Sequence, residues 1–352
     1  MIKEESISKE WIEHIAKSHK ADKILVEKVI RALILLEGLA VSELDFRFKG
    51  GTALMLLLSS GRRLSIDIDI VVADKALDLS PVIDEISRYK GFSRYERQER
   101  KAGSAIDKEH YKLFFQSIIE KKESYVLLDV LKEKILYENV IEIPVDSLFI
   151  TQSGETAKVK VPDFNSLLGD KLTAFAPNTT GIPYKKGDKE MGMEIIKQMY
   201  DIGSLCDYVD NVRVVSSVFS AFAETEIGYR GNNHNVQDVL NDIIDNALEI
   251  CLRGNHGKAN YDILLKGINQ VKGFIFSESF HLEKAITYAA KTVYIASLIK
   301  YEQTEIKRFD ASRLSEIQTW QITEPLNTKL NKIKKTDVEA FFYLYQTLEM
   351  ME

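Results

Sequence analysis

The sequence predicts an α+β fold: an N-terminal domain with a mixed sheet flanked by helices, residues 1–162, followed by an all-α C-terminal domain, residues 163–352. Strand-like and helix-like segments alternate as far as Pro162, whereas nearly every segment from Asp163 onward has helical periodicity. A chain of 352 residues is long enough for two domains, and its six prolines are few, which favours a helix-rich fold. Its 45% hydrophobic and 28% charged residues are typical of a globular protein.

Charge, cysteine content and the N-terminal segment narrow the functional classes. The formal net charge of −6 gives no global attraction for nucleic acid, so such a contact would need a local basic patch. Cys206 and Cys251 lack the spacing of a disulfide framework or zinc site, and we interpret both as buried thiols. The start, MIKEESISKEW, has no apolar segment, and no apolar run approaches the roughly 18 residues of a transmembrane helix. We therefore expect a cytoplasmic protein with no membrane partner.

The N-terminal elements follow from periodicity and capping signals. Residues 22–38 have helical spacing, with Asp22 as the expected N-cap and Gly38 as the expected end of the helix. After a short lead-in, LDFRFKGG, residues 52–59 predict a helix and the alternating, β-branched residues 63–72 predict a strand. Residues 80–88 predict another helix, with Ser80 as N-cap before a proline.

A hairpin and a series of helices complete the predicted order. Residues 110–119 and 125–131 predict two strands joined by the turn EKKE, and the pieces IEIPV and AKVKVP are strand-like. The last predicted helix opens with Thr336 and Glu339 at capping-box spacing. The helices expected beyond Pro162 are 163–175, one around 194–205 after a Pro/Gly/Lys-rich loop, 214–224, 236–251, 259–271, 278–300 and 336–349.

Two carboxylates interrupt the predicted strand 63–72. Because residues two apart on a strand point to the same side, Asp67 and Asp69 project together while the isoleucines between them face the core. Two adjacent carboxylates repel unless a cation lies between them, and a set of oxygen ligands suits a hard ion such as Mg²⁺ or Mn²⁺. An exposed edge strand with one polar face would show the same pattern.

The residues before this strand shift the balance toward a binding site. Gly50, Gly51 and Thr52 lie at a strand-to-helix turn. Glycine there allows the backbone to approach a phosphate closely, and the N–H groups at a helix N-terminus attract the anion. The hydroxyl of Thr52 would add a further contact. Glycines and paired aspartates together predict a nucleoside triphosphate held by backbone and metal.

Two sequence blocks resemble the AbiEii-type nucleotidyltransferase toxins, which belong to the DNA polymerase β-like nucleotidyltransferase superfamily and include the MenT enzymes. The first block is KGGTAL at residues 49–54, and the second is Arg-x-Ser-x-Asp-x-Asp at residues 63–69. Both are present without a substitution. The motifs that carry the resemblance extend over roughly residues 22–205.

The resemblance implies roles for individual residues. Asp67 and Asp69 would bind the catalytic divalent metal, and the turn from Gly50 to Thr52 would hold the triphosphate. Arg63 and Ser65 would shape the site, and Lys49 belongs to the same nucleotide-binding block. Asp129, a charge inside the apolar strand YVLLDVL, is the candidate for the superfamily's third carboxylate, which positions the metal and deprotonates the acceptor hydroxyl. A strand-end aspartate at the sheet margin is the alternative for Asp129.

The family pattern continues into the predicted helical domain. Asp170–Lys171 matches an acidic-Lys pair on a helix, so that Lys171 would neutralise phosphate charge as pyrophosphate leaves. A later block matches at Lys197, Tyr200 and Asp201, whereas Gln198 replaces an aspartate of the family pattern. The resemblance places Lys197 with the nucleotide and gives Asp201 the role of orienting Lys171 or the nucleotide.

Other candidates are weaker. The six histidines do not pair with other ligands at helical or strand spacing, and P-loop and hydrolase motifs are absent from the sequence. Lys112 interrupts an apolar strand and would line the site or simply face solvent. The basic segments 184–189 and 328–335 would contact nucleic-acid phosphates or form solvated faces.

The sequence therefore predicts a Mg²⁺-dependent nucleotidyltransferase that transfers NMP from an NTP to an acceptor hydroxyl. The resemblance implies the toxin of a type IV-like toxin–antitoxin or abortive-infection system, with tRNA as acceptor and a cognate antitoxin protein. The helical domain would complete the nucleotide site and bind the acceptor. A nucleotidyltransferase acting on a small molecule or protein is one alternative, and a non-catalytic nucleotide-binding protein is another, favoured only by Gln198.

Overall fold

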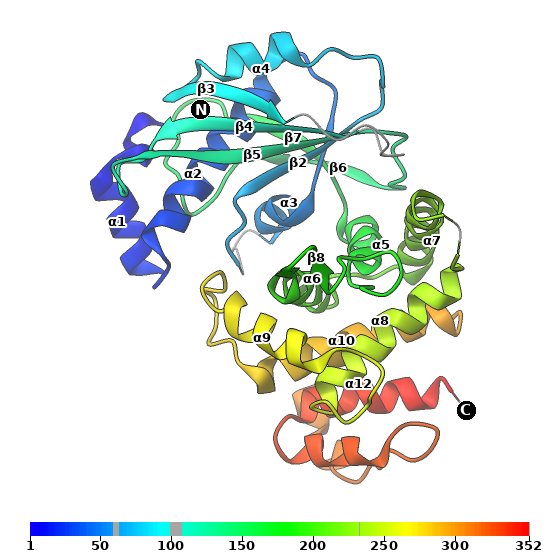
Figure 1. Ribbon diagram of the computed structural model, residues 1–352. Helices are drawn as coiled ribbons and strands as arrows, with labels where there is room; N and C mark the ends of the chain where they lie inside the picture. The colour runs from blue at the N-terminus through cyan, green and yellow to red at the C-terminus, as the bar shows by residue number, and fades with distance from the viewer. Residues whose placement is uncertain (59–62, 99–107, 232, 352) are drawn as a thin grey trace. The chain divides into compact units, whose positions relative to one another are not determined.

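The computed structural model describes residues 1–58, 63–98, 108–231 and 233–351 and divides into two compact units (Figure 1). The first unit is Met1–Asp163 with the short segment Gly273–Ser279, and the second is Phe164–Lys272 with Phe280–Glu352. The short segment joins the first unit because the Leu64 N–H donates to the Phe274 carbonyl at 2.7 Å. The functional roles expected of the two predicted domains stay predictions.

A five-stranded mixed sheet forms the centre of the first unit (Figure 1). Its order is β1-β2-β5-β4-β3, and β2 and β5 are parallel while the other neighbours are antiparallel. The α+β class with a mixed sheet is thus confirmed, as is the predicted hairpin, which is β4 and β5. The strands are β1 (Arg47–Lys49), β2 (Asp67–Val72), β3 (Phe92–Gln98), β4 (Lys108–Gln116) and β5 (Glu123–Lys132), with β6 (Val140–Pro144) and β7 (Lys158–Pro162) as a separate antiparallel pair.

Helices pack on the apolar face of this sheet. Ile68 and Ile70 of β2 and Leu128 of β5 are fully buried there against α2 and its neighbours. The side chain of Asp22 accepts from the N–H groups of Ile24 and Leu25, which confirms it as the N-cap of α2. The helices of the first unit are η1 (Glu4–Ile7), α1 (Lys9–Ser18), α2 (Lys23–Val41), α3 (Gly50–Leu57) and α4 (Ser80–Ile86).

Two predicted helix boundaries are wrong for local reasons. Helix α2 continues past Gly38 to Val41, because this glycine lies against Ile86 of α4 inside the core and does not end the helix. The N-cap of α4 is Leu79 and not Ser80, whose N–H is held by the Asp78 carboxylate at 3.0 Å.

The strand predicted over 63–72 begins only at Asp67. Its first predicted residue, Arg63, instead forms a single antiparallel bridge with Ile275. Strand β3 and helix α1 were not predicted; β3 is an edge strand whose side chains are mostly exposed, so it lacks the apolar alternation of a half-buried strand.

The second unit consists almost entirely of helices (Figure 1). Its predicted helices are confirmed, although the last one is capped by Asp337, which accepts from the Ala340 N–H at 2.9 Å, and not by the predicted box of Thr336 and Glu339. The elements are α5 (Phe164–Ala174), β8 (Lys185–Lys186), β9 (Lys189–Glu190), α6 (Gly192–Leu205), α7 (Val212–Tyr229), α8 (Val236–Cys251), α9 (Tyr261–Val271), α10 (Leu282–Lys300), η2 (Ala311–Arg313), α11 (Leu314–Ile317), η3 (Thr328–Lys335) and α12 (Val338–Glu349).

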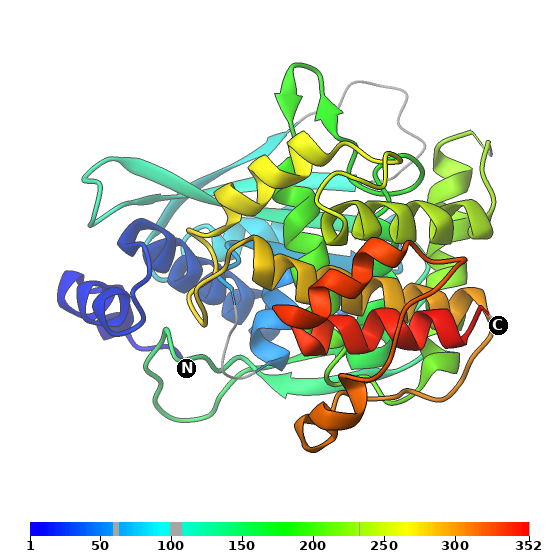
Figure 2. The same ribbon diagram turned by 90° about the horizontal axis from the view of Figure 1, so that it is seen from below.

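Helix α10 is the centre of this unit and packs against α6, α8 and α12. In Figure 2 the red α12 lies alongside the orange α10. Both cysteines are free and buried, as predicted, and burial raises the pKa of the Cys206 thiol to about 12. None of the helices in the described residues has the length and hydropathy that crossing a membrane requires.

Candidate active site

Three carboxylates lie on one face of two adjacent parallel strands. Asp67 and Asp69 alternate along β2 with the buried Ile68 and Ile70, so both carboxylates point away from the helix-covered core. The parallel register pairs Asp69 of β2 with Asp129 of β5. The fold therefore brings together the three aspartates that the sequence singled out.

The glycines before α3 leave room for these side chains. Gly50 has a φ of +82°, and a Cβ built on it would lie 2.1 Å from Oδ2 of Asp69. A Cβ on Gly51 would lie 2.6 Å from Nη2 of Arg63 and 2.7 Å from Oγ of Ser65. Only glycine is compatible with this packing, because a methyl group would occupy the space of the three polar groups. The Gly-Gly pair thus sets the position of Asp69, Arg63 and Ser65 next to the start of α3.

Thr52 and Lys49 connect the same turn to β2. The hydroxyl of Thr52, which is fully buried, donates to the carbonyl oxygen of Asp67 at 2.6 Å and ties α3 to the strand. Lys49 ends β1, pairs in register with Asp69, and holds its ammonium 6.0 Å from the ring of Tyr137. Within the described residues, no side chain caps the N-terminus of α3. The predicted phosphate contacts of this turn stay predictions.

Arg63 is held at the side of the site by the backbone around it. Its side chain is 7% exposed, and Nη1 donates to the carbonyl of Leu64 at 3.2 Å. The bridge to Ile275 fixes its backbone. The guanidinium therefore lies in a nearly buried position beside Gly51, where its planar set of N–H donors suits phosphate oxygens.

His110 is a residue that the sequence did not identify. It lies on β4 directly opposite Asp129, and its Nδ1 is 2.6 Å from Oδ1 of Asp129. The two side chains are 19% and 32% exposed. The antiparallel register of β4 and β5 brings His110 against Asp129. The spacing of residues along the chain gives no sign of this contact. An imidazole in this contact fixes the orientation of the carboxylate.

Lys112 lies two residues further along the same face of β4. Its ammonium is 4.7 Å from the ring centroid of Tyr125, a cation–π contact. The predicted role of Lys112 in lining the site stays a prediction.

The donor set suits a hard divalent cation. Asp67 and Asp69 supply carboxylate oxygens. The Asp69 carboxylate occupies the space that a Cβ on Gly50 would fill. In the part of the chain that the structure describes, no group of three or more His, Cys, Asp or Glu side chains is arranged to hold a metal ion by itself. Mg²⁺ is usually bound by one or two carboxylates together with water and substrate phosphates, which matches a pair of aspartates better than a closed cage.

The candidate residues of the helical unit form a buried ion pair. Nζ of Lys171 on α5 lies 2.8 Å from Oδ2 of Asp201 on α6, with the two residues 7% and 0% exposed. Gln198, at the position where the family pattern has an aspartate, accepts from the same ammonium at 3.1 Å. Lys171 therefore has one carboxylate and one neutral amide as partners.

Two neighbouring residues of the same block have different surroundings. Nζ of Lys197 is 3.2 Å from the carboxylate of Glu194, one turn earlier on α6. Tyr200 is 1% exposed and stacks on Tyr288 with ring centroids 4.5 Å apart. Tyr200 is thus part of the helical core.

Comparison with known proteins identifies related chains. The family described as nucleotidyl transferase AbiEii toxin, type IV TA system, matches residues 34–267. Among solved structures, JHP933 from Helicobacter pylori is 14% identical, with a TM-score of 0.44 over 80% of this chain and 94% of that one. A candidate nucleotidyltransferase from H. pylori is also 14% identical, with a TM-score of 0.42 over 79% and 94% of the two chains. The comparison with curated proteins gives no match.

Proposed function

The chain belongs to the family of nucleotidyl transferase AbiEii toxins of type IV toxin–antitoxin systems, and on this premise we propose that it transfers NMP from an NTP to a hydroxyl group of tRNA with Mg²⁺. Family membership makes the chain a nucleotidyltransferase, which removes the alternative of a non-catalytic binding protein. Nucleotidyltransferases of this superfamily generally use a divalent metal. The observation that carries the proposal is the parallel register that sets Asp69 beside Asp129, with Gly50 packed against the Asp69 carboxylate.

Asp67 and Asp69 would hold the Mg²⁺, or Mn²⁺ in its place. Held by these two carboxylates, the cation would supply positive charge that stabilises an in-line displacement at the α-phosphate. The acceptor hydroxyl oxygen forms a bond to the α-phosphorus, the bond from that phosphorus to the bridging oxygen breaks, and pyrophosphate leaves. Asp129 would take the proton of the acceptor hydroxyl. His110 would hold Asp129 in the orientation that this transfer needs, because its Nδ1 is 2.6 Å from the carboxylate.

Backbone and side-chain donors of the first unit would bind the triphosphate. The N–H groups of Gly51 and Thr52 at the start of α3 carry the partial positive charge of a helix N-terminus. Lys49, Arg63 and Ser65 would add side-chain donors. In the helical unit, we assign Lys171 and Lys197 to phosphate charge and Asp201 to the orientation of Lys171, which its 2.8 Å contact supports.

The proposals for the acceptor and the protein partner are supported by the family alone. We propose tRNA as the acceptor and an antitoxin protein as the partner, in the cytoplasm. A nucleotidyltransferase that modifies a small molecule or a protein would have the same first-unit site. The acceptor must therefore be found by experiment.

Incubation with each of the four α-³²P-labelled NTPs, Mg²⁺ and total tRNA tests the acceptor. We expect label on tRNA with at least one NTP, and no transfer when EDTA removes the metal. Label on the protein alone would contradict tRNA as the acceptor. So would an unlabelled tRNA if a parallel incubation with a small-molecule extract gives a labelled product. Transfer that is undiminished in EDTA would contradict the metal site.

Replacing Gly50 with alanine is expected to damage the site more than it damages the fold. A positive φ costs an L-residue about 1–2 kcal/mol, and the added methyl group would displace the Asp69 carboxylate from 2.1 Å away. We expect nucleotidyl transfer to fall at least about tenfold, beyond the effect of the lost stability.

Gly154→Ala is the matched control, since Gly154 has a φ of +71° and a Cβ there meets nothing within 4 Å in the described residues. Both variants place an alanine at a positive φ, so urea unfolding should show that this backbone strain lowers the free energy of unfolding by a similar amount in each. Equal activity of the two variants would show that Gly50 does not position Asp69.

A further inference from the structure

A short basic hairpin lies between α5 and α6 along the chain of the helical unit. Its strands β8 and β9 pair in antiparallel register, with Lys185 opposite Glu190 and Lys186 opposite Lys189. The turn between them has two residues, and the first, Gly187, has a φ of +61°, which suits a tight hairpin. In Figure 2 the two green strands project beyond the yellow α9, and all four strand residues are exposed.

The lysines of this hairpin form no ion pair or side-chain hydrogen bond within the described residues. Glu190, which faces Lys185, has its carboxylate 3.1 Å from the ammonium of Lys266 on α9. Lys186 and Lys189 face each other across the two strands. Like charges directly opposite each other on a strand pair are destabilising. The hairpin therefore carries a repulsion that a bound polyanion would remove.

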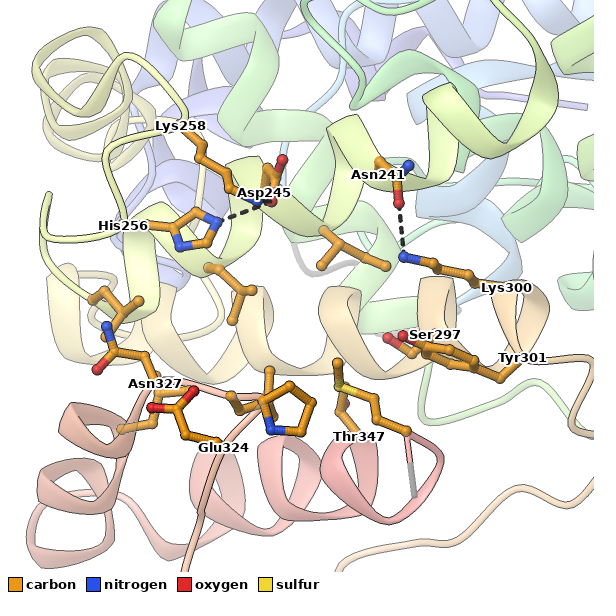
Figure 3. A pocket seen from close by; sticks show the side chains of 17 residues that line it. Asn241, Asp245, His256, Lys258, Ser297, Lys300, Tyr301, Glu324, Asn327 and Thr347 are labelled. Atoms are coloured by element: carbon orange, nitrogen blue, oxygen red, sulfur yellow. Dashed lines mark hydrogen bonds and ion pairs between the residues drawn. The ribbon is translucent and has the colours of Figure 1, made fainter.

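Other lysines of the helical unit do have partners. Lys258 lies 3.2 Å from Asp245, whose carboxylate it shares with His256 (Figure 3). Lys300 donates to the side-chain oxygen of Asn241 at 2.7 Å, as Figure 3 also shows. The hairpin lysines differ from these because their ammonium groups remain available to a partner outside the chain.

Buried groups hold the loop that leads into the hairpin. The carboxylate of Asp242 on α8, a residue that is 7% exposed, accepts from the hydroxyl of Thr179 at 3.0 Å. Arg230, which follows α7, donates to the carbonyl of Thr179 at 2.7 Å. The hydroxyl of Tyr184, directly before β8, accepts from the Asn260 N–H at 3.1 Å. The base of the hairpin is thus fixed before any ligand binds, which lowers the ordering cost of binding.

The hairpin is close along the chain to the lysines that we assign to phosphate. Helix α5 ends at Ala174, three residues after Lys171, and α6 begins at Gly192, five residues before Lys197. At 1.5 Å per residue, Lys197 lies about 8 Å along the helix axis from the start of α6. A polynucleotide with its reactive end near Lys197 would therefore bring its neighbouring phosphates close to the hairpin.

We propose that Lys185, Lys186 and Lys189 bind the phosphate backbone of the polynucleotide acceptor, an inference that rests on the proposed function. With Asp188 in the turn, three lysines and one aspartate give this tip a net charge of +2. A nucleic acid supplies several phosphates in a row, and lysines that neutralise them release bound counterions. Backbone contacts orient a nucleic acid without reading its sequence, which suits flexible ammonium groups.

Fluorescence anisotropy of a labelled tRNA transcript with the full chain, without NTP and over a series of salt concentrations, tests this proposal. The variant combines Lys185→Gln, Lys186→Gln and Lys189→Gln. We expect it to bind tRNA at least about tenfold more weakly at low salt, and the slope of log binding constant against log salt to fall by about 2–3. In the label assay, KM for tRNA should rise while kcat and KM for NTP stay near the wild-type values.

Three lysines of η3 give a control with the same change of charge. Lys329, Lys332 and Lys335 are exposed, form no ion pair within the described residues, and belong to an element that packs on α12. We expect their combined replacement by glutamine to leave tRNA binding close to that of the wild type, because salt screens charges that do not touch the bound phosphates. Equal weakening by both triple variants would show that binding follows total charge and would overturn the proposal.

A charge-retaining variant completes the test. Lys186→Arg with Lys189→Arg keeps both positive charges and should bind tRNA as the wild type does. Weak binding by this variant, tRNA binding unchanged by the glutamine variant, or wild-type protein that does not bind tRNA at low salt would each overturn the proposal. So would a glutamine variant that loses binding to phosphatidylserine vesicles but not to tRNA. Binding is measured without NTP, so these outcomes do not depend on whether label is transferred, and circular dichroism checks that each variant is folded.

Discussion

Replacing Asp69 with asparagine is expected to reduce nucleotidyl transfer by about a hundredfold to a thousandfold, the scale seen when one group that stabilises transition-state charge is lost. Asparagine has the size of aspartate but lacks the negative charge that holds a divalent cation. The amide also places an N–H₂ donor or a neutral oxygen where Gly50 and the β2–β5 register hold the carboxylate. The measurement is label transfer at saturating Mg²⁺.

Asp74→Asn is the matched control for this change. Asp74 lies two residues after the end of β2 and is exposed, and its side chain accepts from the Ala76 N–H at 2.9 Å, a contact that asparagine retains. Both variants should unfold at temperatures close to that of the wild type. Activity of Asp69→Asn within tenfold of Asp74→Asn would remove Asp69 from the metal site.

The same variant tests the toxin role in cells. Expression of the wild-type chain without an antitoxin should slow the growth of the host, whereas Asp69→Asn should leave growth unchanged. Equal growth of cells expressing either protein at equal levels would contradict a toxic activity that depends on this site. It would leave nucleotidyl transfer itself open to the label assay.

Replacing Lys171 with methionine is expected to lower the free energy of unfolding by about 3–5 kcal/mol, because it removes the ammonium that lies 2.8 Å from the buried Asp201 carboxylate. Both residues of the pair are nearly or fully buried, so water cannot take the place of the lost ammonium. Activity should fall as well if Lys171 neutralises phosphate charge. Urea unfolding and label transfer measure the two effects separately.

A double variant separates the structural role of Lys171 from its catalytic role. Adding Asp201→Asn to Lys171→Met removes the uncompensated charge, and we expect much of the stability to return. If Lys171 acts on phosphate, activity stays low in the stable double variant. Recovery of activity together with stability would show that Lys171 only supports the fold.

Lys197→Met is the control for this pair. The side chains of Lys197 and Glu194 are 13% and 30% exposed, so water reaches this ion pair more easily than the pair of Lys171 and Asp201, and its loss should cost less stability. A destabilisation as large as that of Lys171→Met would indicate that the burial of an ion pair does not determine how much its loss destabilises this protein.

The positions of the candidate residues could be predicted from the sequence to different degrees. The alternation of β2 was visible in Asp67, Ile68, Asp69 and Ile70, because the side-chain period of a strand is local. The role of Gly50 was visible only in part. The sequence indicated a turn with room for a phosphate, whereas the structure shows that the same glycine makes room for the Asp69 carboxylate.

Contacts between distant residues were not visible in the sequence. His110 was set aside since it has no ligand partner at local spacing, yet cross-strand register places it against Asp129. Gly38 was interpreted as the end of a helix, but it is the packing of α2 against α4 that requires a small residue there.

The sequence by itself determined the α+β class, the order of the main elements, the Gly-Gly turn and the carboxylate pair. These follow from periodicity, capping and short motifs, which are properties of neighbouring residues. Only the tertiary structure decided which side chains meet: Asp129 with Asp69 and His110, and Lys171 with Asp201. The physical reason is that strand register and helix packing are set by the burial of the whole core, which no short stretch of sequence contains.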